Sequence, residues 1–225
     1  MSVSDLSVQS TADKLSRFLR SLGADLVLDL KVAEDWSILE LQREVLERWR
    51  AREQAGPNPR TKSHTVLSSL CPGWVCYAEK THGDWLLPHI SRWEQFTLDS
   101  TFMTVVGCCF LRVKSAQQLM GSLVKTFLPR KLGVDPDRIR HITLMPCFDK
   151  KLEASRDDFL DSETGIKDVD CVITTLEVED MLTREACDLG SLEAGALDTL
   201  VEAGVREVIA NTGSASGGYS DHVFR

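Results

Sequence analysis

The sequence predicts a two-lobed α/β unit. Its 225 residues, 43% hydrophobic and 27% charged, suffice to bury a large core and fall between one large domain and two small ones. Segments with apolar residues at helical spacing are interspersed with short β-branched runs, a pattern typical of helices packed on a sheet. Two short runs end at loops in which a cysteine adjoins a proline, Cys71 and Cys147. We therefore expect an α/β fold whose strands deliver these cysteines.

The first third of the chain is predicted to run helix, strand, helix, strand. Ser10 or Thr11 can cap the first helix, and Gly23 supplies a left-handed stop. The apolar face of that helix consists of Leu15, Phe18, Leu19 and Leu22. A strand at 25–30 and a helix at 37–53 follow. The residues of the second helix expected to face inward are Ile38, Leu39, Leu41, Val45 and Leu46.

The first cysteine loop is expected between a strand and a helix. Residues 65–69 form a short strand that ends at Cys71. Pro72 suits the first turn of a helix, because the N–H that proline lacks has no partner there. Cys71 is thus predicted to lie at a helix N-terminus.

The remaining elements repeat this alternation. Strand 139–145 delivers Cys147, and the β-branched run 169–174 predicts a buried strand. The other predicted elements are a helix at 115–127, a turn at 135–137, helices at 177–186 and 197–203, a strand at 205–210, a glycine-rich turn at 213–218 and a helix beginning at Asp221.

Charge and cysteine usage exclude several classes of protein. A net charge of -8 repels nucleic acid and anionic membrane surfaces. Seven scattered cysteines indicate thiols in a reducing compartment. The apolar stretch 102–113 is interrupted by Arg112 and falls short of the roughly 20 residues that cross a bilayer. Residues 1–16 lack the pattern of a signal peptide, so we expect a protein of the cytosol, with the nucleus as a further location.

Each of the two cysteine loops has two interpretations when taken alone. A thiolate at a helix N-terminus is stabilised by the dipole and by unpaired N–H groups, which suits Cys71 to ligate iron or to act as a nucleophile. Alternatively, Cys71 merely fills the start of a helix. Lys150 and Lys151 can hold a thiolate or an anionic cluster near Cys147, or can form a solvated face. Cys76, about one helical turn past Cys71, is a further candidate to help bind the iron.

Taken together, the loops resemble a known family. Two sequence motifs resemble the first two cluster-binding loops of iron-only hydrogenases: Cys-Pro-Gly-Trp at 71–74 and Met-Pro-Cys-x-x-Lys-Lys-x-Glu at 145–153. Three neighbouring segments, 75–83, 117–125 and 149–156, are similar in sequence to the cytosolic iron-sulfur assembly proteins related to nuclear prelamin A recognition factor. The resemblance extends over nearly all of residues 1–225, as one iron-only-hydrogenase large-subunit-like domain that is incomplete at its C-terminus.

This resemblance implies two lobes that clamp a 4Fe-4S cluster, with Cys71 and Cys147 as two of its thiolate ligands. In the family the other two thiolates come from a Cys-x-x-x-Cys loop, expected beyond residue 225, and an N-terminal module with its own cysteines precedes the first helix. A cluster held by two thiolates is expected to be labile or absent. Leu70 stands where true hydrogenases carry a proton-passing cysteine, whereas Lys150 matches a lysine of the hydrogenase site.

One stretch, residues 92–113, does not fit the family. It contains Cys108 and Cys109, which would be a metal or redox pair under a functional interpretation. We favour the alternative, a non-standard splice product or mistaken exon, and assign the stretch no chemistry. The histidines show no zinc-site spacing.

The resemblance yields two principal functional hypotheses. The first is a non-catalytic carrier that holds a 4Fe-4S cluster and passes it to proteins of the cytosolic iron-sulfur targeting complex. The second is an iron-independent protein-interaction module like the prelamin-binding relative. An enzyme acting on a small-molecule substrate, a hydrogenase or thiol oxidoreductase, is not expected, because Leu70 removes one required relay.

Overall fold

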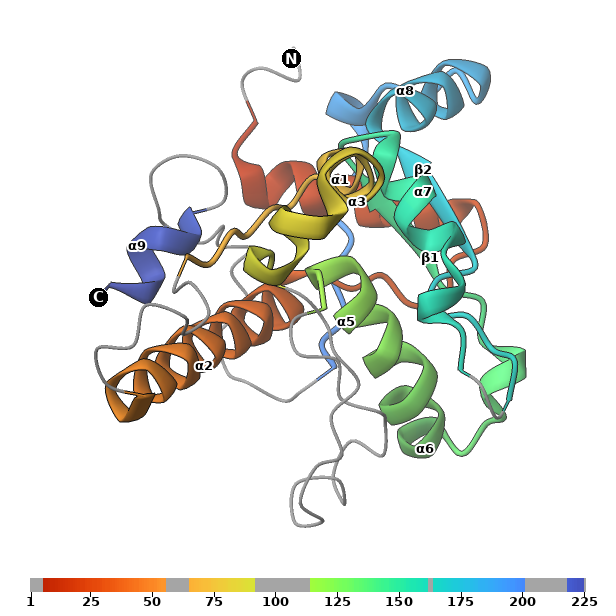
Figure 1. Cartoon of the computed structure of the whole chain (residues 1–225). Coiled ribbons are helices and arrows are strands. Elements are labelled where there is room, and N and C mark those ends of the chain that lie inside the picture. Colours follow the sequence, from red (N-terminus) through yellow and green to blue (C-terminus); the bar gives the residue numbers. More distant parts are fainter. Residues whose placement is uncertain (1–5, 56–64, 92–113, 162–163, 201–217, 225) are drawn as a thin grey trace.

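Helices dominate the part of the chain that the structure, a computed structural model, describes: residues 6–55, 65–91, 114–161, 164–200 and 218–224 (Figure 1). The α-helices are α1 (Val8–Ser21), α2 (Lys31–Ala55), α3 (Pro72–Leu86), α5 (Ala116–Ser122), α6 (Leu128–Leu132), α7 (Asp149–Ser155), α8 (Thr175–Arg184) and α9 (Tyr219–Val223). A parallel pair of strands, β1 (Ile142–Met145) and β2 (Cys171–Thr174), completes the regular structure. The described residues are thus mostly helical with a small parallel sheet, which agrees in part with the predicted α/β class.

The shorter helical segments connect these elements. They are the π-helical segment Leu123–Phe127 and the 3-10 turns Leu87–His89, Pro136–Arg138, Asp157–Phe159 and Leu189–Ser191. The turn predicted at 135–137 is the one at Pro136–Arg138, where Asp135 is the N-cap.

Helix α1 has the predicted stop but a different start. The hydroxyl of Ser7 accepts a hydrogen bond from the N–H of Ser10 at 3.1 Å, so Ser7 is the N-cap and not Ser10 or Thr11. Gly23 has a φ of +102°, a left-handed conformation that side chains disfavour, and the helix ends before it as predicted. Phe18 is the buried anchor of the apolar face.

Helix α2 is longer than predicted and buries a different stripe. It begins at Lys31, whose N–H donates to the Asp29 carboxylate at 2.9 Å, six residues before the predicted start. Of the residues expected to face inward, Ile38 and Leu41 are buried, whereas Leu39 and Leu46 are exposed. The buried stripe runs at helical spacing through Ala33, Ser37, Leu41 and Glu44. This face was not predicted, because three of its buried residues are small or polar and add little to a hydrophobic pattern.

Two predicted strands are reduced to single bridges. In the segment 25–30 only Leu28 pairs, with Asp198, and in the segment 65–69 only Leu67 pairs, with Ile90. Leu67 donates its N–H to the His89 carbonyl and accepts the Ser91 N–H, both at 2.7 Å. Each segment thus contributes one bridged residue and not the strand that its apolar composition predicted. Cys71 therefore does not follow a strand, contrary to the prediction.

The strands predicted at 139–145 and 169–174 are present in shorter form as β1 and β2, and their parallel pairing was not predicted. Ile142 lies opposite Cys171 and Met145 opposite Thr174. In both strands the second and fourth residues are buried and the first is exposed, so β2 is half-buried and not buried on both faces as predicted. The carboxyl ends of parallel strands share one edge of the sheet. The Cys147 loop and the start of α8 therefore leave the sheet side by side.

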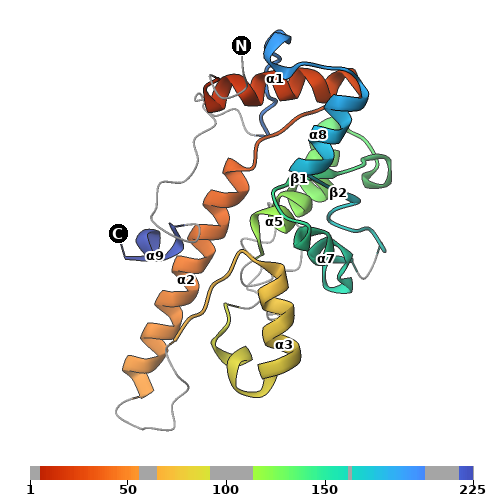
Figure 2. The ribbon, with the colours of Figure 1, turned by 90° about the horizontal axis from the view of Figure 1, so that it is seen from above.

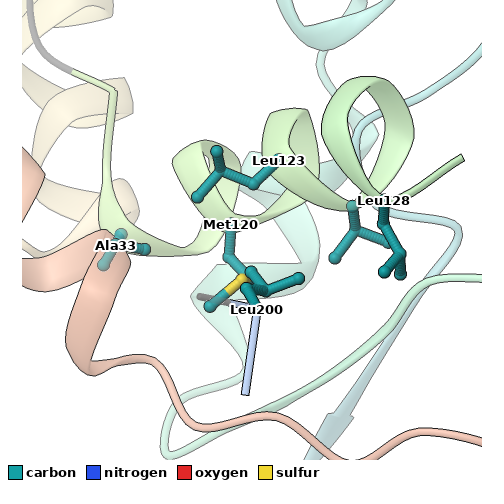
Figure 3. Close-up of a cluster of buried hydrophobic side chains, with 7 residues drawn as sticks. Ala33, Met120, Leu123, Leu128 and Leu200 are labelled. Atoms are coloured by element: carbon teal, nitrogen blue, oxygen red, sulfur yellow. The ribbon is translucent and has the colours of Figure 1, made fainter. Parts of the chain in front are cut away.

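The segment after Ser115 forms the main apolar core. Ser115 caps α5 by accepting the N–H of Gln118 at 3.4 Å, which confirms the predicted start of this helix. The helical run then continues through the π-helical segment into α6. Met120, Leu123 and Leu128 pack with Ala33 of α2 and with Leu200, as Figure 3 shows.

Two ion pairs, one of which includes the buried Lys125, link this core to the sheet. The ammonium of Lys114 lies 2.5 Å from the Asp168 carboxylate, and that of Lys125 lies 2.6 Å from the Asp170 carboxylate. The Asp170 carboxylate also accepts the N–H of His141 at 2.7 Å, directly before β1. Since a buried charge is costly without a partner, these pairs fix how α5 lies on β1 and β2.

The C-terminal predictions are partly outside the described residues. Residues 197–200 are not helical, so the predicted helix at 197–203 is wrong for its described part, where Leu200 instead joins the core. The predicted strand at 205–210, residues 213–217 of the glycine-rich turn and the insert 92–113 with Cys108 and Cys109 lie outside the described residues. The last helix, α9, begins at Tyr219 and packs beside α2, where Gln42 donates to the His222 carbonyl at 2.5 Å (Figure 2).

Membrane spanning is not indicated by the described helices, since none combines the required length with sufficient apolarity.

We predict that Gly121→Ala destabilises the protein although alanine favours helices. A Cβ at Gly121 would lie 2.5 Å from the carbonyl oxygen of Asp168, a backbone atom that cannot move aside. Overpacking of this kind costs about 1–3 kcal/mol, more than the roughly 1 kcal/mol that helix propensity returns. Urea unfolding of the variant beside Thr183→Ala, an exposed helical control, measures the difference. A gain in stability for Gly121→Ala would contradict the close approach.

We predict that acidification through pH 6.5 destabilises the fold through His141. Burial lowers the pKa of this imidazole below its ordinary value of 6.5, although the hydrogen bond to the Asp168 carbonyl opposes the shift. The unfolded chain then binds more protons in the window below 6.5, so the free energy of unfolding falls as pH falls through it. Unfolding curves across this window should show a shallower dependence in His141→Gln, and an unchanged slope would argue against the assignment.

Candidate functional site

Cys71 lies directly before α3 and caps it. Its N–H donates to the Ser69 hydroxyl at 3.1 Å, and its carbonyl accepts the N–H of Val75 at 3.2 Å. The sulfur accepts the N–H of Trp74 at 3.4 Å, the bond that a serine or aspartate oxygen makes at an ordinary N-cap. The side chain is otherwise exposed. The predicted setting of Cys71 at a helix N-terminus is confirmed, with its sulfur aligned on a backbone donor.

Cys147 lies two residues beyond the end of β1. Its carbonyl accepts the N–H of Lys150 at 3.2 Å, which starts the turn that becomes α7, and its side chain is exposed. The strand therefore delivers this cysteine to the carboxyl edge of the sheet, as predicted. Cys171 pairs with Ile142 and so lies at the opposite end of the two strands.

The two cysteine loops meet through Asp149. One carboxylate oxygen of Asp149, which follows Cys147 by two residues, lies 3.9 Å from the Cys71 sulfur. Gly73 faces the same carboxylate so closely that a Cβ there would lie 2.6 Å from its oxygen. Helices α3 and α7 are accordingly neighbours, as Figure 2 shows. Cysteines 76 positions apart in the sequence thus belong to adjoining loops at one place on the molecule.

The lysines after Cys147 are paired with carboxylates. Lys150 is buried, and its ammonium lies 2.8 Å from the Glu153 carboxylate. Lys151 lies 2.6 Å from the Glu177 carboxylate, and this hydrogen bond, followed by those from Thr174, lowers the pKa of Glu177 to about 2. Glu177 and Thr174 also form the capping box of α8. Lys151 thus joins α7 to α8, Lys150 pairs within α7, and the ion-pair partner of each ammonium is a carboxylate.

Cys76 lies on a different side of α3 from the meeting point. Its sulfur is 3.7 Å from the guanidinium of Arg156, which also donates to Glu79 and to Asp158. These bonds, first that to Glu79, raise the pKa of Arg156 above its ordinary range. Five residues along a helix correspond to a rotation of about 140°. Nothing in the structure brings Cys76 to the Asp149 contact.

A cavity of about 130 Å³ adjoins the Cys71 loop. Its lining includes Ser69, Leu70, Pro72, Glu79, Glu153 and Arg156. The three charged residues in this set are already paired, Arg156 with Glu79 and Glu153 with Lys150. Leu70 and Pro72 of the Cys71 loop also border this cavity.

The donor set suits iron and sulfur more than a single hard cation. Cys71 and Cys147 are exposed soft ligands on adjoining loops, the type that iron-sulfur clusters take. Across the part of the chain that the structure describes, no three His, Cys, Asp or Glu side chains converge closely enough to hold one metal ion. The residues present therefore fit part of a cluster shell, with two thiolates.

Two residues of this site were missed by sequence reasoning. Ser69 and Asp149 were read as flanking residues, whereas they contact the N–H and the sulfur of Cys71. The spacings Ser-x-Cys and Cys-x-Asp are present in the sequence. The contact of Asp149 with the Cys71 sulfur could not be predicted from them, because it depends on how the two loops pack.

Comparisons with known proteins find relatives over nearly the whole chain. The sequence profile of the family described as iron only hydrogenase large subunit, C-terminal domain, matches residues 2–94 and 103–225. The chain is 45% identical over 221 residues to cytosolic iron-sulfur assembly component 3 of Bos taurus and 42% identical over 222 residues to cytosolic Fe-S cluster assembly factor narfl of Xenopus tropicalis. Each alignment covers 98% of this chain but 41% of the relative, so the chain spans about two fifths of their length.

Solved structures show the same fold. An FeFe-hydrogenase studied for oxygen inactivation at its H cluster superposes with a TM-score of 0.75 at 29% identity, over 98% of this chain and 48% of that one. The apo FeFe-hydrogenase HydA1 of Chlamydomonas reinhardtii gives a TM-score of 0.73 at 28% identity, over 95% of this chain and 48% of that one. The gap in the profile match, 95–102, falls within the stretch 92–113 that lacks a recognised counterpart.

We predict that a short bifunctional thiol reagent bridges Cys71 and Cys147. In a chain whose other cysteines are replaced by serine, dibromobimane should become fluorescent, because it does so on alkylating two neighbouring thiols. A matched chain that keeps only Cys147 and Cys171 should stay dark, since these two lie at opposite ends of the strands. Equal fluorescence in both chains, or none in the first, would contradict the adjoining loops.

Proposed function

This chain belongs to the family of the iron only hydrogenase large subunit, C-terminal domain, and on that premise we propose that it holds an iron-sulfur cluster and delivers it in cytosolic iron-sulfur protein assembly. The observation that carries the proposal is the 3.9 Å contact between Asp149 and the Cys71 sulfur, because it makes the Cys71 and Cys147 loops adjoin. The relatives named as cytosolic assembly factors support the setting.

The cluster proposed is of the 4Fe-4S type, with Cys71 and Cys147 as two of its ligands. Both are exposed, and the Cys71 sulfur already accepts a backbone N–H, which stabilises a thiolate. The family resemblance places the other two thiolates in a Cys-x-x-x-Cys loop beyond residue 225. When bound, the cluster would be the cargo of the protein, and this chain would contribute binding and orientation. With two thiolates alone we expect it to be labile.

We propose that the chain does not catalyse hydrogen chemistry. Leu70 directly precedes Cys71, in the position where the resemblance places a proton-passing cysteine in hydrogenases, and a leucine side chain carries no proton. Lys150, which matches a lysine of the hydrogenase site, is held by Glu153 at 2.8 Å. The partners would be proteins of the cytosolic iron-sulfur targeting complex, in the cytosol and also in the nucleus, and not nucleic acid, a membrane or a small-molecule substrate.

One observation favours the second candidate, an iron-independent interaction module. On α3, His82 contacts the rings of both Tyr77 and Trp85, with centroid separations of 5.8 and 5.6 Å. Tyr77 is 57% and Trp85 62% exposed, and exposed aromatic side chains of this kind commonly anchor partners. Partner capture that survives replacement of both Cys71 and Cys147 by serine would support this module over the carrier.

We predict that Cys71→Ser or Cys147→Ser lowers the iron bound after anaerobic reconstitution with iron and sulfide. Loss of one ligand should weaken iron binding by at least about tenfold, as changes around metal sites do. Iron and sulfide per chain, together with the visible absorption band, give the measurement.

The controls are Cys171→Ser, at the far end of the strands, and Cys108→Ser combined with Cys109→Ser. Equal losses in the controls would defeat the assignment. A longer chain that carries the Cys-x-x-x-Cys loop should retain its cluster through brief exposure to air or chelator, whereas this chain should lose it. In cells, a short form that matched the longer protein in supporting cytosolic iron-sulfur enzymes would contradict the carrier mechanism.

A further inference from the structure

We propose that helix α2 binds α2 of a second copy of this chain, in antiparallel orientation, through a stripe of exposed apolar side chains. The stripe consists of Trp36, Leu39, Leu46 and Trp49. The inference does not depend on iron binding, because the two cysteine loops lie at the starts of α3 and α7. The result would be a two-fold symmetric dimer that buries the same helix face of each copy.

The exposed stripe is the first argument. Leu39, Leu46 and Trp49 are each more than half exposed, and Trp36 is exposed as well. Leucines seven residues apart lie almost on one line along a helix, and a tryptophan lies about one turn beyond each of them. The opposite face of α2 is already buried in the core, for example at Ala33. A helix that is apolar on more than one face is usually covered on each of them.

The neighbours of α2 leave this stripe uncovered. Gln42 donates to the His222 carbonyl of α9 at 2.5 Å, and Glu44 accepts a hydrogen bond from Ser91 at 2.5 Å. These contacts lie on other sides of the helix, since Gln42 and Glu44 are not part of the stripe. Figures 1 and 2 show the C-terminal half of α2 reaching to the edge of the molecule. A second copy can therefore approach this face.

Self-complementarity is the second argument. The two leucines and the two tryptophans are both centred midway between residues 42 and 43. With a two-fold axis at that point, antiparallel α2 helices place Leu39 opposite Leu46 of the second copy. Arg43 lies beside the axis, where its charge is neutralised by two glutamates of its own helix, at 3.8 and 3.1 Å. One apolar stripe thus matches its own rotated copy.

The charges at the ends of the stripe are the third argument. Asp35 and Arg50 share the midpoint of the leucines, so each Asp35 faces Arg50 of the second copy in the antiparallel pair. Lys31, which pairs with Asp35 within the helix, comes near Glu53 of the second copy. Parallel helices would instead place Asp35 against Asp35 and Arg50 against Arg50, which costs free energy. The charges therefore favour the antiparallel orientation.

The test measures the mass of the whole chain by sedimentation equilibrium over a dilution series. A thiol reductant is present, so that the exposed cysteines form no disulfides. A single helical stripe offers less area than the roughly 800 Å² that each partner contributes to a stable interface. We therefore expect a reversible dimer that dissociates on dilution.

A charge within the stripe should weaken this dimer. We expect Leu46→Glu to raise the dissociation constant of the dimer at least about tenfold, because it buries an unpaired carboxylate at the centre of the interface. Leu176→Glu changes an exposed leucine of α8 and is the matched control, which should leave the constant unchanged. Circular dichroism melts verify that both variants fold.

Two charge reversals test the orientation. Asp35→Arg and Arg50→Asp should each weaken the dimer about tenfold, because each places like charges at both ends of the pair. An equimolar mixture of the two variants should dimerise as tightly as the wild type, since the mixed pair restores opposite charges at both ends. Within one copy the two residues lie about 22 Å apart along the helix. Recovery in the mixture therefore reports a contact between copies, and a folding defect cannot imitate it.

Three outcomes overturn the proposal. They are a chain that stays monomeric throughout the series or assembles beyond two copies, equal effects of Leu46→Glu and Leu176→Glu, and a mixture that dimerises no more tightly than its components. Each of them leaves the cluster proposal untouched, because none of the substituted residues lies in a cysteine loop.

Discussion

The parallel pairing of β1 with β2 is the constraint on which the rest of the site depends. Parallel strands bring their carboxyl ends to one edge, so the Cys147 loop and the capped start of α8 leave the sheet together. The pairs Lys114–Asp168 and Lys125–Asp170 fix this sheet against α5 and the π-helical segment. Because Lys125 is buried and Lys114 and Asp168 are half-buried, the sheet cannot shift on the core without leaving these charges unpaired. The two strands described are thereby held firmly against the core.

The Cys71 loop reaches the same place by a different route. Among residues 65–70, the described stretch directly before Cys71, no strand is formed, and a single bridge between Leu67 and Ile90 holds this segment. The hydroxyl of Ser69 and the N–H of Trp74 then fix the cysteine at the start of α3. The bidentate bond between Arg156 and Glu79 holds α3 against the end of α7. The position of Cys71 thus depends on local capping hydrogen bonds and on the ion pair between Arg156 and Glu79, and not on a preceding strand.

The family fold serves different chemistry according to a few side chains near these loops. The hydrogenase structures and this chain share their fold, and in this chain Leu70 precedes Cys71 and Asp149 follows Cys147 by two residues. Leucine cannot relay a proton, and the carboxylate of Asp149 adds negative charge beside Cys71. A shared fold therefore does not by itself fix the chemistry of its sites.

The sequence by itself determined the two cysteine motifs, the start of α3 at Pro72, the start of α5 behind Ser115, and both strands of the sheet, because proline, capping hydroxyls and β-branched runs act on the nearest residues. It could not give the buried stripe of α2, since Ser37 and Glu44 also bond with partners distant in sequence: Ser37 donates to the Lys114 carbonyl, and Ser91 donates to Glu44. The tertiary structure alone decided that Asp149 meets Cys71, and that Cys171 lies away from Cys147. Such contacts depend on strand direction and helix packing, which join residues too far apart along the chain for local pattern to record.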